Sequence, residues 1–214
     1  MIPLRFASLL LIAFAGLALE ERAALAQGPD DQVKRVEAGM LYSLGALIRS
    51  SRTVDDGTFV IGVLGKDPFD GEDAAGRPVN HLAAMAKESN ARAGKDKRKK
   101  IVIKKPFPSA KDYERCHLLI VSANALPASA EKTAPERMKA AKAIAVGAKD
   151  GAPVLVVADA KQGAPVGFMP VDIGGGGIEV RLELNVTIVK ETGFDKISAS
   201  LYTVARNNGW VINK

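Results

Sequence analysis

Short, unbroken apolar segments separated by helical patterns constrain the fold of this chain more than any other feature. Four of them lie at residues 59–64, 101–103, 116–121 and 153–158. Segments of valine, isoleucine and leucine without polar alternation are typical of strands that are buried on both faces. Alternation of such strands with helices predicts a mainly parallel sheet that carries helices on both faces.

The helices of this arrangement are expected from apolar residues at three- and four-residue spacing. The clearest stripe covers residues 33–48, and a weaker one around Leu82 ends at Gly94. An alanine- and lysine-rich helix is expected over 134–149, with Pro135 in its first turn. A last helix is expected around Ile197, Leu201 and Val204.

A β-hairpin is predicted near the C-terminal end of the chain. Residues 166–173 are apolar, four glycines follow at 174–177, and residues 178–184 alternate strictly. The alternation indicates that one face of the hairpin is wet. A strand, not a helix, follows the glycines, which argues against a phosphate-binding loop. The sequence therefore predicts a single three-layer α/β domain with four mainly parallel strands and a C-terminal hairpin.

The first 26 residues have the pattern of a secretory signal peptide. One positive charge lies within residues 1–5, an apolar run of 14 residues covers 6–19, and Ala24 and Ala26 precede Gln27 as small residues. The apolar run is shorter than a membrane-spanning helix. We expect export with cleavage before Gln27, which removes 26 of the 214 residues and leaves a domain over 27–214. An uncleaved N-terminal anchor is the alternative.

Positive charge predominates, with a formal net charge of +6. Such a balance suits an acidic partner, an anionic lipid surface or nucleic acid. Export and the lack of interleaved aromatic residues argue against nucleic acid, and a solvated loop is the plainer interpretation of the densest charge cluster. That cluster consists of Lys95, Lys97, Arg98, Lys99, Lys100, Lys104 and Lys105.

Catalytic chemistry has little support in the sequence. Cys116, the only cysteine, precedes His117, and adjacent strand residues point to opposite faces, so they form no nucleophile–base pair. Two histidines without metal-ligand spacing make a zinc site unexpected. We expect no catalytic set, metal or cofactor. Cys116 is kept as a candidate redox thiol and as a route to a homodimer, and an enzyme using Cys116 or Asp159 is a rival hypothesis.

The alternative prediction is a ligand pocket where the first strand ends. Gly65, Asp67 and Phe69 follow that strand, and open parallel sheets bind ligands at the carboxyl ends of their strands. The spacing of Gly62 and Gly65 does not fit a dinucleotide-binding fingerprint. These residues support an alternative function, a periplasmic small-molecule binding module.

Several strings, taken in order, resemble the YfiR/HmsC-type periplasmic family. They cover nearly the whole chain from Val33 to Arg206. The strings are the residues 37–42, the run 60–69 with its aspartate–proline–phenylalanine turn, the cysteine-led 116–120, 154–159, 167–169, 180–185 and 193–198.

The resemblance implies a non-enzymatic periplasmic regulator. Such a protein binds the periplasmic sensor region of an inner-membrane diguanylate cyclase and restrains it, which keeps cyclic-di-GMP and biofilm output low. An outer-membrane lipoprotein relieves the restraint by sequestering the regulator. These partners are expectations from the resemblance alone.

Overall fold

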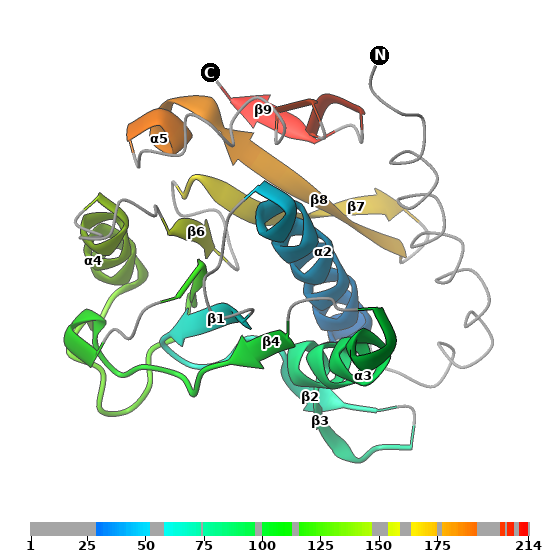
Figure 1. Ribbon diagram of the computed structural model, residues 1–214. Helices are drawn as coiled ribbons and strands as arrows, with labels where there is room; N and C mark the ends of the chain where they lie inside the picture. Colours follow the sequence, from blue (N-terminus) through cyan, green and yellow to red (C-terminus); the bar gives the residue numbers. More distant parts are fainter. Residues whose placement is uncertain are drawn as a thin grey trace.

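A computed structural model describes residues 29–51, 58–73, 75–96, 100–112, 116–146, 154–158, 164–174, 177–191, 202–203, 205–207 and 210–213. Helices and strands alternate along most of these residues (Figure 1). In chain order the elements are α2 (Pro29–Ser51), β1 (Thr58–Leu64), β2 (Asp70–Glu72), β3 (Pro78–Asn80), α3 (His81–Asp96), β4 (Lys100–Ile103), the 3₁₀ helix η2 (Ala110–Asp112), β5 (Leu118–Val121), α4 (Ala134–Val146), β6 (Leu155–Ala158), β7 (Val166–Gly174), β8 (Gly177–Asn185), α5 (Val186–Glu191) and β9 (Val211–Asn213).

Seven strands of the described residues form one sheet in the order β4-β1-β5-β6-β7-β8-β9. The five strands from β4 to β7 are parallel, β7 and β8 pair antiparallel, and β9 is parallel to β8. The predicted hairpin is therefore part of the main sheet, because β7 pairs with β6 through Val157–Val166 and Ala158–Gly167. The predicted mainly parallel sheet is confirmed.

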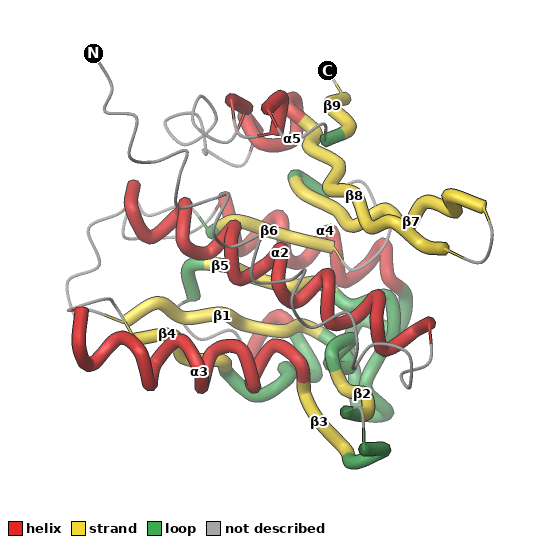
Figure 2. The backbone as a smooth tube through the Cα atoms, turned by 90° about the vertical axis from the view of Figure 1, so that its right-hand side faces the viewer, coloured by secondary structure: helices red, strands yellow, loops and turns green. Residues whose placement is uncertain are grey.

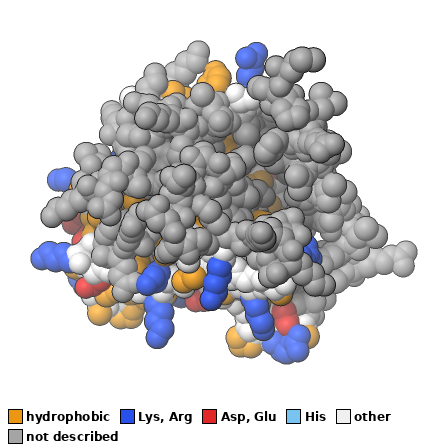
Figure 3. Space-filling view, viewed as in Figure 1, with side chains coloured by type: hydrophobic (Ala, Val, Ile, Leu, Met, Phe, Trp, Pro, Cys, Tyr) orange, Lys and Arg blue, Asp and Glu red, His pale blue; other side chains and the backbone are white. Residues whose placement is uncertain are grey.

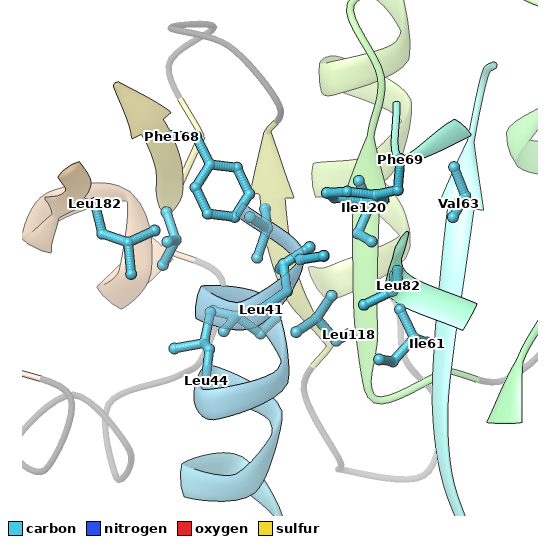
Figure 4. Close-up of a cluster of buried hydrophobic side chains, with 14 of the residues drawn as sticks. Leu41, Leu44, Ile61, Val63, Phe69, Leu82, Leu118, Ile120, Phe168 and Leu182 are labelled. Atoms are coloured by element: carbon cyan, nitrogen blue, oxygen red, sulfur yellow. The ribbon is translucent and has the colours of Figure 1, made fainter. Parts of the chain in front are cut away.

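Helices cover both faces of the sheet (Figures 1 and 2), and the sheet separates the core into two clusters. On one face, Leu41 and Leu44 of α2 pack with Phe168 and Leu182 of the hairpin strands (Figure 4). On the other face, α4 packs against the parallel strands. The predicted three-layer α/β fold is confirmed. No helix among the residues described here is long and apolar enough to cross a membrane.

Local chemistry explains where the helices begin. The first turn of α2 carries Asp30 and Asp31, whose negative charge suits a helix N-terminus. At the start of α4, Thr133 and Glu136 bond to each other's backbone N–H groups at 3.4 and 2.9 Å, a capping box. Pro135 lies in the first turn of α4, as predicted.

The hairpin strand β8 confirms the expected wet face. Val180, Leu182 and Leu184 are buried, whereas Glu179 and Arg181 are exposed and bonded to each other at 2.9 Å. The residues at 175–176, inside the predicted glycine turn, lie outside the described residues.

Strands β2, β3 and β9 and helix α5 were not predicted from the sequence. Strands β2 and β3 form a separate two-stranded sheet in a segment for which only polar chain was expected before the Leu82 helix. Helix α5 and strand β9 are too short for a periodicity to identify them. Of the expected last helix, residues 202–203 and 205–207 are helical, while Ile197, Leu201 and Val204 lie outside the described residues.

Candidate functional site

The turn after β1 lies at the carboxyl edge of the parallel sheet, as the sequence suggested for Gly65. The Gly65 N–H donates to the carbonyl of Phe107 at 3.0 Å, and the Lys66 N–H donates to that of Asn124 at 2.8 Å. Gly65 has φ of +97°, and a Cβ there would lie 2.7 Å from the Asn124 carbonyl oxygen. Only glycine fits, because any side chain would collide with backbone.

Asp67 holds the next bend of this turn. Its Oδ1 accepts a hydrogen bond from the Phe69 N–H at 2.9 Å. Burial raises the pKa of Asp67, and the nearby Asp70 carboxylate acts in the same direction, while hydrogen bonds from the Phe69 N–H and the Asn80 side chain oppose the rise. The carboxylate therefore shapes the backbone at this edge of the sheet.

Phe69 belongs to the core. Its side chain is fully buried and lies with Leu82, Ile61 and Ile120 (Figure 4). Its carbonyl accepts a hydrogen bond from the N–H of His81, which begins α3. Gly65, Asp67 and Phe69 thus share one turn, in which the phenylalanine anchors the chain and the aspartate bends it.

A buried histidine near this turn was not singled out from the sequence. His81 is 6% exposed, and its Nε2 lies 3.9 Å from Oδ1 of Asp31 without a hydrogen-bond partner among the described residues. Asp31 also accepts a hydrogen bond from the Glu72 N–H at 3.2 Å. The pair joins the start of α2 to the β2–β3 hairpin and α3.

The surroundings of His81 favour its neutral form. Burial lowers the pKa of His81, Asp31 opposes this shift, and the cations Arg35 and Lys34 reinforce it. Gly71 passes close to both groups, since a Cβ on it would lie 2.1 Å from Asp31 Oδ1 and 3.0 Å from His81 Nε2. Gly71 therefore leaves little free space between the Asp31 carboxylate and the His81 imidazole.

Arg137 of α4 is the second residue that sequence reasoning missed. Its side chain is fully buried, and within the part of the chain that the structure describes its guanidinium donates to four backbone carbonyls. Nε bonds to Ser122 at 3.0 Å and Nη2 to Ala123 at 2.5 Å, just after β5. Nη1 bonds to Glu131 at 2.9 Å and Lys132 at 3.2 Å, just before α4. One side chain thus ties together both ends of the β5–α4 connection.

Cys116 and His117 point to opposite faces of the sheet, as their adjacency predicted. Cys116 is 3% exposed and belongs to the core cluster on the α4 side. The ring of His117 stacks on Phe59, a residue of the other cluster, at 5.2 Å between centroids. His117 Nδ1 accepts a hydrogen bond from the Val60 N–H at 2.9 Å. Both side chains are engaged in packing on their own face.

Several other residues singled out from the sequence lie partly or wholly outside the described residues. The cleavage-site residues Ala24, Ala26 and Gln27 and the rival catalytic residue Asp159 lie outside the described residues. Of the lysine-rich stretch, Lys95 is in α3, residues 97–99 are not described, and Lys100 is exposed at the start of β4. Among the described residues no group of three or more histidine, cysteine or carboxylate side chains could hold a metal ion.

No protein family, curated protein or solved structure gives a significant match to the chain.

Proposed function

We propose that the protein is a periplasmic regulator that binds the sensor region of an inner-membrane diguanylate cyclase and restrains it, so that cyclic-di-GMP and biofilm output stay low. One observation carries the proposal: the strings that resemble the YfiR/HmsC-type family follow the order expected for that family over most of the chain. The signal-peptide pattern before Gln27 supports the periplasmic location.

The positions of these strings in the fold add support. The first lies on α2, the second runs through β1 into the turn at Asp67, and the next four fall on β5, β6, β7 and β8, while the string at 193–198 lies outside the described residues. Five of the strings therefore lie on β1, β5, β6, β7 and β8, which are neighbours in one sheet. A resemblance confined to one loop would carry far less weight, because short loop motifs recur on unrelated folds.

The polar groups at the carboxyl edge of the sheet also favour a binding role. The side chains of Arg137, Asp67 and Glu136 all bond to backbone groups and hold loops in place. Because these side chains fix the backbone, they fix the shape of the surface at this edge of the sheet. A rigid surface recognises a partner with little loss of conformational entropy on binding.

The experiment is affinity purification of the exported, tagged protein from chemically cross-linked membranes, with cyclic-di-GMP measured in parallel in cells that lack the gene. The proposal expects a diguanylate cyclase with a periplasmic region among the recovered proteins, and a raised cyclic-di-GMP level in the deletion strain. The matched control is residues 27–214 expressed without the leader, which should not restore a low level. Repeated recovery of no cyclase, with unchanged cyclic-di-GMP, would overturn the proposal.

A periplasmic small-molecule binding module is the second candidate. It is favoured by the polar groups Asp67, Asn80 and His81, which gather where β1 ends. A ligand that binds only the folded state raises the melting temperature. A ligand screen by thermal shift that gives a concentration-dependent rise, together with no cyclase in the purification, would favour this function over the first.

A further inference from the structure

Strand β4 is the last strand on one side of the seven-stranded sheet, next to β1. In a parallel pair, successive residues of such a strand turn their backbone N–H and C=O groups alternately toward the neighbouring strand and away from it. The Lys104 N–H donates to the Ile61 carbonyl at 2.9 Å, so residue 104 faces β1. By this alternation Ile101 and Ile103 direct their backbone groups away from the sheet. An outward row of this kind is a template for pairing with another strand.

The side chain of Asn90, in α3, occupies this edge at Ile101. Its Oδ1 accepts a hydrogen bond from the Ile101 N–H at 2.8 Å, and its Nδ2 donates to the Ile101 carbonyl at 2.7 Å. One bond accepted and one donated are the two bonds that a residue of an added antiparallel strand would make there. Helix α3 runs alongside β4 and brings the carboxamide to this position (Figure 2). A strand therefore cannot pair at Ile101 without displacing Asn90.

The choice of asparagine at position 90 has a cost within the helix. Asn90 lies in the interior of α3, a helix rich in alanine. Asparagine is a poorer helix former than alanine, because its side chain competes for backbone hydrogen bonds. Here the carboxamide bonds to the backbone of a different element, β4, and not to its own helix. The residue is therefore explained by what it does at the edge of the sheet.

Positive charge and a proline flank the same edge. Lys100 and Lys105 are exposed, Lys104 is half-buried, and Pro106 follows without an N–H to donate. Lysine and proline on an edge strand oppose the addition of another strand. Figure 3 shows Lys and Arg side chains along the lower part of one face, the part in which Figure 1 places β4 and α3. Two copies of this edge would bring like charges together, which opposes their pairing.

We propose that the Asn90 side chain closes the β4 edge against a second copy of this chain, whose own β4 would otherwise add to the sheet. The edge is self-complementary, because antiparallel pairing of two β4 strands about Val102 sets Ile101 of each copy opposite Ile103 of the other. Both outward-facing residues of both copies are then used. The proposal concerns self-association and does not depend on the proposed function.

The test is sedimentation velocity of the purified exported protein over a range of concentrations. About 0.5 M salt screens the repulsion between the lysines. Asn90→Ala should raise the association constant at least about tenfold over the wild type, which corresponds to about one net hydrogen bond gained. Ser89→Ala is the matched control, because Ser89 is half-buried beside Asn90 and bonds to the Tyr42 hydroxyl at 2.9 Å. It loses a contact of α3 but leaves the edge closed, so it should associate as the wild type does.

A second substitution identifies the surface through which Asn90→Ala associates. Ile103→Pro, added to Asn90→Ala, removes an outward N–H and should return the association constant to the wild-type value. Asn90→Asp keeps the acceptor for the Ile101 N–H and loses the donor to its carbonyl, so it should give an intermediate constant. Melting temperatures show which variants fold.

Amide hydrogen exchange decides the question without the proline variant. In Asn90→Ala, protection of the Ile101 and Ile103 amides should rise with protein concentration, because pairing of the two copies covers them. An unchanged association constant in Asn90→Ala, an equal rise in Ser89→Ala, or association without added protection at these two amides would overturn the proposal. A folded double variant that still associates would do the same. None of these results bears on the recovery of a cyclase from membranes, so the two proposals fail separately.

Discussion

Replacing Arg137 with methionine tests the internal tie at the carboxyl edge of the sheet. Methionine keeps an unbranched stem of similar length and removes the guanidinium, so the change isolates the hydrogen bonds. Four backbone carbonyls lose their donor in Arg137→Met, namely those of Ser122, Ala123, Glu131 and Lys132. We expect the connection between β5 and α4 to loosen and the free energy of unfolding to fall.

The burial of each acceptor sets the magnitude. Ser122 is fully buried, so its carbonyl loses a charge-assisted bond without gaining water, which costs about 1–3 kcal/mol. Ala123 and Lys132 are exposed and Glu131 is half-buried, so those three carbonyls recover water at about 0.5–1 kcal/mol each. Removal of the buried guanidinium charge also removes the cost of its desolvation, which offsets part of the free energy lost with the four hydrogen bonds. The net destabilisation is about 2–4 kcal/mol.

Urea denaturation followed by circular dichroism measures this change. With a slope of about 2 kcal/mol per molar urea, the midpoint should fall by about 1–2 M. Arg137→Lys is the matched control, because its ammonium retains the charge but cannot reach carbonyls at both ends of the connection. It should lie between the wild type and Arg137→Met. A midpoint for Arg137→Met within about 0.3 M of the wild type would refute the reasoning.

Three further predictions follow from local geometry. Gly65→Ala should lower the free energy of unfolding by at least about 1–2 kcal/mol, whereas Gly39→Ala, in a helix with room for a Cβ, should raise it by about 0.5–1 kcal/mol; urea midpoints that move in the same direction would contradict this. Because burial lowers the pKa of His81, the unfolded chain binds a proton on His81 at higher pH than the folded chain does, and stability should fall as pH drops below about 6.5. His81→Gln should flatten that part of the pH–stability curve. An unchanged curve in this variant would count against the prediction. Hydrogen bonds from Arg77 lower the pKa of Asp73 to about 2, so the stabilising contribution of Asp73 is complete above pH 3.8 and disappears toward pH 2. In Arg77→Gln the pKa of Asp73, followed through its carboxyl chemical shift, should return toward 3.8.

The sheet could be predicted because its central strands have a distinctive sequence pattern. Each is short, almost wholly apolar and bounded by turn residues, and burial on both faces demands that composition. The same logic placed Cys116 and His117 on opposite faces. Strand β2 carries no such pattern, since its residues Asp70 and Glu72 are exposed and it is stabilised by pairing with β3. Short, exposed hairpins depend on contacts that a local pattern does not encode.

The polar contacts could not be predicted, for a different physical reason. His81 and Asp31 lie 50 positions apart, and they meet only because α2 and α3 pack side by side on one face of the sheet (Figure 2). Arg137 follows a glutamate in an alanine- and lysine-rich helix, where an arginine ordinarily faces solvent. Its burial depends on where the β5–α4 connection passes, which is a property of the assembled sheet.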